Sequence, residues 1–201
     1  KITLYQKIHS NLGKPSVIQT SDGGYLYSDN NGIAKLSSSG EIEWKNRQYR
    51  DFTDAIQHSN GYYYLVSEAL EHKTAKGKVY KFNSKGKNIW MKGFGRGCYR
   101  VEFNSIIESS DGELIIVGAK SHGNKSFSCT FEWYNDAWII KVDADKGGNI
   151  WEKTYGGKNY EKFEDIVRNP NGGYYAIGTA CNKKNPPEAG ELCAKSMSAL
   201  W

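Results

Sequence analysis

A short motif recurs four times along the chain and constrains the fold more than any other feature. Each copy has an apolar pair, a polar turn in which Gly follows Asn or Asp, and a run of alternating aromatic and aliphatic residues. The copies are VIQTSDGGYLYS from Val17, AIQHSNGYYYLVS from Ala55, IIESSDGELIIVG from Ile106 and IVRNPNGGYYAIG from Ile166. A strand, a turn that needs a positive φ angle and a second strand are the signature of a β-hairpin. The sequence therefore predicts four related hairpins.

A second hairpin follows the first in three of the copies. These hairpins are GIAKLSSSGEIEWK from Gly32, GKVYKFNSKGKNIWMK from Gly77 and AWIIKVDADKGGNIWEK from Ala137, each with a Trp in its last strand. Two hairpins per copy make a four-stranded antiparallel unit, and a radial arrangement of such units is a β-propeller. We therefore expect an all-β propeller domain of about four blades. The expected blade bounds are approximately 9–49, 50–95, 96–157 and 158–201.

The two ends of the chain suggest how the last blade is completed. KITLYQKI at the start resembles the final strand of a blade, and KSMSALW at the end resembles the beginning of a third strand. Residues 1–8 could therefore pair with the fourth blade and close a ring of four by strand complementation. The alternative is that the chain forms part of a larger ring, and the sequence leaves both open.

The acidic segment DADKGG, from Asp143, has the look of a calcium-binding loop. Such a loop needs more oxygen ligands and a later bidentate Glu. The sister copies place Ser37 and Ser39, or Asn83 and Lys85, where Asp143 and Asp145 stand here. The segment is therefore interpreted as a tight turn, and no metal site is expected.

Cysteine spacing favours disulfides over a zinc site, because no C-x-x-C pair occurs. Cys181 and Cys193 flank the loop CNKKNPPEAGELC and are predicted to form one disulfide. Cys98 and Cys129 would then form the second. The alternative is four free, buried thiols.

The charge balance and the apolar runs exclude some classes of protein. The net charge is +5, from 27 basic and 22 acidic residues, and the basic residues form no stripe, so a nucleic-acid partner is not expected. No apolar run approaches the roughly 18 residues of a membrane helix, so no transmembrane segment is expected.

The chain starts at Lys1 without an apolar leader. We expect that any signal peptide has been removed and that the protein is secreted or on the cell surface.

The pattern W-x-K-T-Y-G-G … D-I-V … N-G-G-Y-Y-A-I-G-T, preceded by D-A-W-I-I-K-V-D, resembles a repeat of secreted and lipid-anchored bacterial β-propeller proteins. The resemblance covers essentially the whole chain, best over 136–178 and more loosely over 17–90. It implies an exported propeller. It says little about a ligand, because architecture does not fix function.

The run IIKVDADKGGNIWEK is also similar to the tryptophan-docking repeat of quinoprotein propellers, in which D-x-x-x-G-x-x-x-W recurs. In those proteins the turn and the Trp are packing features of the blade. The quinone-dependent dehydrogenases of that group are much longer, and their best-known branch has an adjacent cysteine pair that this chain lacks. Only the repeat carries over, so no cofactor is expected.

A candidate ligand-binding face follows from propeller topology, which places the loops between blades beside the loops between second and third strands. The inter-blade loops here combine Tyr with basic residues, and the long segment SHGNKSFSCTFEWYND from Ser121 adds aromatics. Aromatics beside arginines suit sugar rings, anionic groups or a protein partner. The candidate residues are Arg47, Tyr49, Arg50, Arg96, Tyr99, Arg100, Phe131, Trp133, Tyr134 and Tyr160. The alternative is that the tyrosines pack between blades and the arginines are solvated.

No catalytic motif such as H-E-x-x-H or G-x-S-x-G occurs in the sequence. Asp54 and Asp165 hold matching positions, just before the first strands of their blades, where Ser16 and Ser105 stand in the other two. A carboxylate there is interpreted as an acceptor for backbone donors rather than as a general acid.

Three functions from different classes follow from these observations. The expected function is a non-enzymatic, exported binding or adhesion module that recognises a glycan or a protein through the aromatic and basic loops. One alternative is a structural subunit that assembles by strand complementation. Another is a polysaccharide-acting enzyme, which would need paired acids across a central pocket that the sequence does not display.

Overall fold

The computed structural model describes residues 15–67, 77–95, 101–121, 135–157 and 159–181, and the backbone of 195–200. All regular elements in this part of the chain are β-strands, and nearly all neighbouring strands pair antiparallel. The predicted all-β class is confirmed. Residues 1–8, which were expected to complete the last blade, lie outside the described residues.

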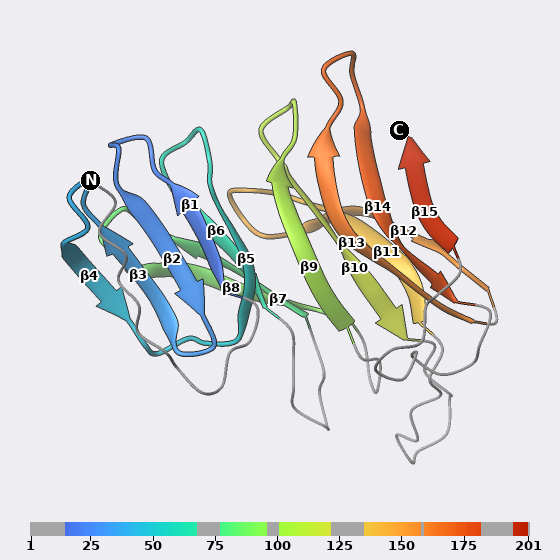
Figure 1. Cartoon of the computed structure of the whole chain (residues 1–201), viewed down its shortest axis with the longest axis horizontal. Coiled ribbons are helices and arrows are strands. Elements are labelled where there is room, and N and C mark those ends of the chain that lie inside the picture. Colours follow the sequence, from blue (N-terminus) through green and yellow to red (C-terminus); the bar gives the residue numbers. More distant parts are fainter. Residues whose placement is uncertain are drawn as a thin grey trace.

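The strands form four successive groups, which we call units 1 to 4. The individual strands are labelled in Figure 1. Unit 1 contains β1 (Ser16–Gln19), β2 (Tyr25–Asp29), β3 (Gly32–Leu36) and β4 (Ile42–Asn46). Unit 2 contains β5 (Phe52–Gln57), β6 (Tyr63–Ser67), β7 (Gly77–Phe82) and β8 (Asn88–Phe94). Unit 3 contains β9 (Val101–Glu108), β10 (Leu114–Ser121), β11 (Asn135–Val142) and β12 (Asn149–Tyr155). Unit 4 contains β13 (Tyr160–Arg168), β14 (Tyr174–Cys181) and β15 (Lys195–Leu200).

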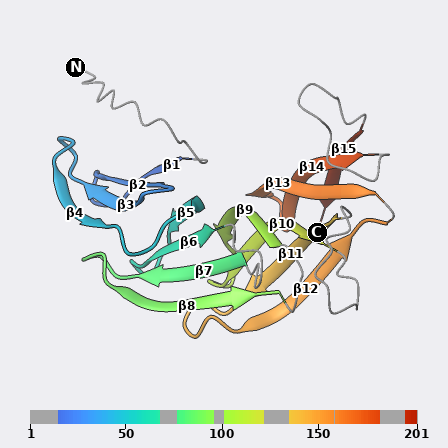
Figure 2. The same ribbon diagram turned by 90° about the horizontal axis from the view of Figure 1, so that it is seen from below.

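Within each unit, every strand pairs with the next one in sequence. Units 3 and 4 share one sheet through a single parallel pairing between Asn135 and Tyr160. Figure 2 shows the units following one another along an arc, with β1, β5, β9 and β13 toward its inner side and β4, β8 and β12 toward its outer side. The arc is open between unit 4 and unit 1, so closure into a propeller stays a prediction.

The first hairpin of every unit closes with the same turn. In unit 1 the Thr20 N–H donates to the Gly24 carbonyl and the Gly23 N–H donates to the Thr20 carbonyl, both at 2.9 Å. The same two hydrogen bonds recur in the turns that begin at His58, Ser109 and Asn169. Gly23 has a φ of 80°, as a three-residue hairpin loop that ends in a left-handed residue requires. The predicted hairpins are confirmed.

The acidic segment from Asp143 is a turn of the second hairpin in unit 3, as predicted. The Asp143 N–H donates to the Gly148 carbonyl at 2.8 Å, and Gly147 has a φ of 70°. Asp143 Oδ1 accepts the backbone N–H groups of Asp145 and Lys146. The Asp143 carboxylate therefore stabilises the turn itself, which accounts for an acidic residue at this position.

One tryptophan of unit 1 and one of unit 2 each contact the second-hairpin turn of the following unit. Trp44 Nε1 donates to the Ser84 carbonyl at 2.8 Å, and Trp90 Nε1 donates to the Asp145 carbonyl at 2.8 Å. A Cβ on Gly86 would come within 2.5 Å of the Trp44 ring. The turn glycine therefore serves twice: it allows the positive φ angle, and it gives the indole of the preceding unit room to lie flat against the backbone.

The core lies between successive units. Leu26 of unit 1 packs with Phe82 of unit 2, and Val66 of unit 2 packs with Ile106 of unit 3. Val117 of unit 3 belongs to a third cluster, with Phe163 and Ile166 of unit 4. The sheets of units 2 and 3 therefore bury one face against the unit before and the other against the unit after, while units 1 and 4 each bury one face in this way.

A line of polar contacts joins the inner strands. Ser16 Oγ donates to Asp54 Oδ1 at 3.3 Å, and Ser105 Oγ donates to Asp165 Oδ1 at 2.9 Å. Asp54 also accepts the N–H groups of Ala55 at 2.8 Å and of Ile106, in the next unit, at 3.0 Å. Burial raises the pKa of Asp54, while these donors oppose the rise.

The position of these carboxylates differs from the prediction. Asp54 and Asp165 lie inside β5 and β13, at places where the pairing register shifts, and not before the strands. At these shifts, Asp54 and Asp165 each accept the N–H of the residue that follows. The interpretation of these residues as acceptors for backbone groups is confirmed.

Lysines of the third strands form ion pairs that were not predicted from the sequence. Lys35 lies 2.8 Å from Asp22 and 3.3 Å from Glu43, and its side chain is only 1% exposed. Lys141 forms the equivalent ion pair with Asp111. The ion pair and hydrogen bond with Lys141, with help from Ser109, lower the pKa of Asp111 to about 2. These pairs tie the third strand to the first-hairpin turn of the same unit.

Gly118 is expected to be intolerant of a side chain. It lies at a register shift of β10, and a Cβ there would be 1.8 Å from the Glu102 carbonyl oxygen. Gly118→Ala should lower the free energy of unfolding by about 1–3 kcal/mol, since the inner strand must move. Urea denaturation measures the change. Gly157→Ala is the matched control, because a Cβ there meets no atom within 4 Å; equal losses in both variants would contradict the steric explanation.

The ion pair of Lys141 with Asp111 should make stability depend on pH in acid. The folded-state pKa of Asp111 is about 2, below the ordinary 3.8, so the stabilisation is present above 3.8 and lost as the pH falls toward 2. The melting temperature of the wild type should therefore exceed that of Lys141→Met most above pH 3.8, and the gap should narrow toward pH 2. Circular dichroism melts at several pH values measure it. Lys87→Met, at an exposed site, should show no such narrowing, and a gap independent of pH would disprove the linkage.

Candidate functional site

The residues predicted to bind a ligand fall partly within the described structure. Arg47 and Arg50 are exposed on the connection between β4 and β5. Tyr49, between them, is half-buried and makes edge contacts with Tyr80 and Phe82, with ring centroids 5.4 and 5.7 Å apart. The other candidates in the loops, Arg96, Tyr99, Arg100, Phe131, Trp133 and Tyr134, lie outside the described residues.

Tyr160 is buried at the start of β13, opposite Cys181 of β14. The alternative interpretation, in which these tyrosines pack between units, therefore fits both Tyr49 and Tyr160. Cys181 is buried as well. Its predicted partner, Cys193, lies outside the described residues, as do Cys98 and Cys129, so both disulfides stay predictions.

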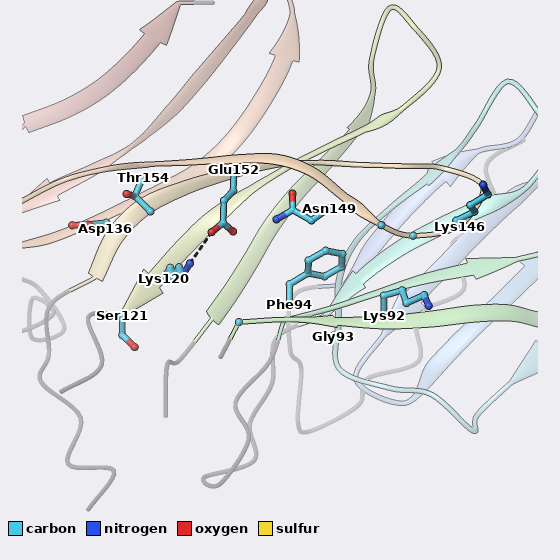
Figure 3. Close-up of a pocket in the computed structure, with 13 residues that line it drawn as sticks. Lys92, Gly93, Phe94, Lys120, Ser121, Asp136, Lys146, Asn149, Glu152 and Thr154 are labelled. Atoms are coloured by element: carbon cyan, nitrogen blue, oxygen red, sulfur yellow. Dashed lines mark hydrogen bonds and ion pairs between the residues drawn. The ribbon is translucent and has the colours of Figure 1, made fainter. Parts of the chain in front are cut away.

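A pocket of about 780 Å³ lies between unit 2 and unit 3. Residues of β8 form one wall, and residues of β10, β11 and β12 and of the turn before β12 form the other (Figure 3). The polar side chains of the lining include three lysines and two carboxylates. The lining residues are Lys92, Gly93, Phe94, Gly95, Lys120, Ser121, Asp136, Lys146, Gly147, Gly148, Asn149, Glu152 and Thr154.

Aromatic rings form the support beneath Lys120. Phe94 makes an edge contact with Phe103, with ring centroids 6.0 Å apart, and Phe103 stacks on Trp138 at 5.4 Å. Lys120 Nζ lies 4.9 Å from the centre of the Trp138 ring and 3.2 Å from Glu152 Oε1. The cation is therefore held in place by a ring face and a carboxylate together. Figure 3 shows Lys120 and Glu152 pointing toward each other across the pocket wall.

Lys92 and Lys146 differ from Lys120 because both are exposed. Lys92 lies on β8, and Lys146 lies in the turn before β12, so the two cations come from opposite walls. A Cβ on Gly147 would come within 2.6 Å of Lys92 Cγ. The absence of a side chain at Gly147 thus allows the stem of Lys92 to pack against the opposite wall.

Two buried carboxylates meet near one end of the pocket. A Cβ on Gly156 would lie 2.3 Å from Asp136 Oδ1 and 2.8 Å from Glu161 Oε2. Glu161 Oε2 also accepts the N–H of Gly157 at 3.4 Å. Asp136 belongs to the pocket lining and Glu161 does not. Gly156 is therefore the residue whose small size lets these acidic groups approach the backbone.

This pocket was missed from the sequence. Its lysines are at positions 92, 120 and 146, in two different strands and a turn, and with no common spacing. The one available signal is the cluster of glycines around the second-hairpin turn of unit 3, which the sequence alone explains as residues of a tight turn. Only the packing of unit 2 against unit 3 brings these residues together.

No protein-family model and no curated protein matches the sequence. Among solved structures, a protein of unknown function from Bacteroides caccae is similar, with a TM-score of 0.56 and 12% identity over 96% of this chain and 63% of that one. A mannose phosphorylase from Leishmania mexicana has a TM-score of 0.50 and 11% identity over 87% and 68% of the two chains. This chain thus spans about two thirds of the length of either protein. At such identities the likeness concerns the fold alone.

The described residues contain no helix with the length and hydrophobicity needed to cross a bilayer.

Proposed function

We propose that the four units belong to a β-propeller that acts as a non-enzymatic, exported binding module for an acidic oligosaccharide. The propeller assignment is supported by the recurring turns, the indole contacts between units and the arc of sheets (Figure 2). The Bacteroides caccae structure, which is similar over 96% of this chain, supports the arrangement of the sheets relative to one another. Export rests on the resemblance to secreted propeller repeats.

The pocket between units 2 and 3 is the observation that carries the ligand assignment. Its volume of about 780 Å³ falls within the range of roughly 300–1,000 Å³ that is usual for small-ligand sites. Lys92, Lys120 and Lys146 outnumber the two carboxylates of the lining. Ammonium groups from both walls suit a ligand with carboxylate, sulfate or phosphate substituents.

The remaining lining suits sugar hydroxyl groups. Ser121, Asn149 and Thr154 offer hydroxyl and amide groups that can both donate and accept hydrogen bonds. Phe94 adds an apolar surface, and the neighbouring glycines expose backbone groups to the pocket. The hydroxyl, amide and charged groups of the lining favour a ligand that can form hydrogen bonds.

The pocket is also adjacent in sequence to the loops predicted to carry the ligand face. Arg96 follows the lining residue Gly95 directly, and Trp133 and Tyr134 come just before the lining residue Asp136. The predicted aromatic and basic residues therefore adjoin the pocket lining in the sequence. This connection favours one binding region in which the lysines bind charge and the loops supply stacking surfaces.

Binding should depend on the two exposed lysines of the pocket. We expect the wild type to bind a uronic-acid or sulfated oligosaccharide more tightly than its neutral counterpart. Reversing both charges, with Lys92→Glu and Lys146→Glu, should weaken binding of the acidic ligand at least about tenfold. The melting temperature should change only slightly, because both side chains are exposed and only the stem of Lys92 packs against the opposite wall. Isothermal titration calorimetry measures the affinity.

The matched control for this test reverses two exposed lysines away from the pocket, with Lys45→Glu and Lys85→Glu. It carries the same change in net charge and should retain binding. Equal weakening in both double variants would indicate non-specific attraction to a basic protein and would reject the pocket. Breakdown of the oligosaccharide by the wild type, lost on Asp136→Asn, would replace the binding module with the enzyme alternative.

A further inference from the structure

Apolar side chains are exposed at both ends of the arc of units. Val167, Tyr175 and Ile177 of unit 4 are exposed on the face that points away from unit 3, which we call the trailing face. Val17 and Tyr25 of unit 1 are exposed on the face that points away from unit 2, which we call the leading face. Two separate sheets thus present apolar faces at the ends of one arc.

The residues of the trailing face have buried equivalents in the other units. Superposition of the four hairpin turns, which share their hydrogen bonds, places Ile177 at the position of Val66 and Val117, both fully buried. Tyr175 takes the position of Tyr64 and Ile115, which are buried against the following unit. Ile177 is 55% exposed. The trailing face of unit 4 thus has the composition of an interface between units.

The leading face shows the same relation. Val17 stands at the position of Ala55, Ile106 and Ile166, each at most 3% exposed, but is itself 64% exposed. Tyr25 stands at the position of Tyr63, which is buried against unit 1. Each end of the arc therefore presents one half of the interface that recurs three times inside the chain.

The polar contacts of the inner strands also match at the two ends. Along the arc, the equivalent positions alternate between donor and acceptor: Ser16, Asp54, Ser105 and Asp165. Both described hydrogen bonds of Asp165 use its Oδ1 atom. Asp54 Oδ2 accepts the N–H of Ile106 in the following unit. The equivalent donor for Asp165 would be the N–H of Val17, beside the hydroxyl of Ser16.

From these observations we propose that the trailing face of unit 4 docks on the leading face of unit 1 of a second copy of this chain. The leading face of unit 1 complements unit 4 both in its apolar positions and in the donors of its inner strand. Unit 1 of the same chain lies across the open side of the arc, so the occupant is a second copy (Figure 2). The contact is head to tail, so two different surfaces meet, and it extends the internal interfaces without a new kind of packing. It is independent of ligand binding, since the pocket lies between units 2 and 3.

The test is the mass in solution of two charged variants, alone and mixed. The wild type should reach at least twice the 22.6 kDa of one chain, as measured by sedimentation equilibrium. Ile177→Lys blocks the trailing face and Val17→Lys blocks the leading face, so each variant alone should be a monomer. An equimolar mixture should form a dimer, because each variant keeps the face that the other lacks. Both sites are exposed in the single chain, so each variant should keep the wild-type circular dichroism spectrum.

Ile89→Lys is the matched control, since Ile89 is exposed on the outer strand β8, away from both faces. It should associate as the wild type does. A wild type that stays monomeric at every concentration would overturn the proposal and would indicate that other parts of the chain cover both faces. Association abolished by Ile177→Lys but untouched by Val17→Lys would also overturn it, because two identical faces would then be in contact.

Discussion

Burial of apolar side chains between successive strand units is the interaction on which the rest of this structure depends. Each sheet is thin and has two faces, and a single unit could bury neither face by itself. Stacking along the arc gives units 2 and 3 a partner on both sides, which is how Val66 and Val117 become inaccessible to solvent. The free energy of unfolding of such an arrangement is approximately the sum of the stability of each unit alone and the stabilisation from each interface between neighbouring units. An exposed face at the end of the series is the natural consequence.

The polar contacts between units serve a different purpose from the apolar ones. Apolar packing is tolerant of small shifts, whereas hydrogen bonds fix the relative position of two sheets. Thr53 Oγ1 donates to the Phe103 carbonyl at 2.6 Å, and Asn104 Nδ2 donates to the Phe163 carbonyl at 2.7 Å. Trp44 and Trp90 make such contacts near the outer strands. The interfaces between units 1 and 2 and between units 2 and 3 are thus held by hydrogen bonds toward both their inner and their outer sides.

The pocket follows from a local departure from this packing. Between units 2 and 3 the lining includes four glycines, at positions 93, 95, 147 and 148. Without side chains there, the walls formed by β8 and by the turn before β12 enclose space that larger residues would fill. Lysines then line this space, held by ring faces and carboxylates or exposed at its rim. The interface between units 2 and 3 therefore has two parts: apolar packing that stabilises the fold, and a pocket with polar groups. A ligand could bind in the pocket without disturbing the apolar packing.

Much of the fold was predictable because it depends on local pattern. The turn glycines, the strand alternation and the recurrence of the Trp residues specify hairpins without reference to the rest of the chain. The site was much less predictable. The loop candidates came from topology alone. The half-buried position of Tyr49 and the buried position of Tyr160 depend on neighbours such as Tyr80 and Cys181 that are far away in sequence. The sequence around Asp54 and Asp165 also contains no local signal for the register shifts that occur at these residues.

By itself the sequence determined the class of fold, the four repeated hairpins and the turn role of the segment from Asp143, because hydrogen bonds and φ angles within a few residues decide them. Only the tertiary structure decided which faces are buried, where the lysine-lined pocket lies, and that the apolar positions of Val17 and Ile177 remain exposed. Equivalent residues lie in the same kind of hairpin in every unit. Their burial differs because it depends on whether another sheet packs against them. The sequence of one repeat does not specify whether such a sheet is present.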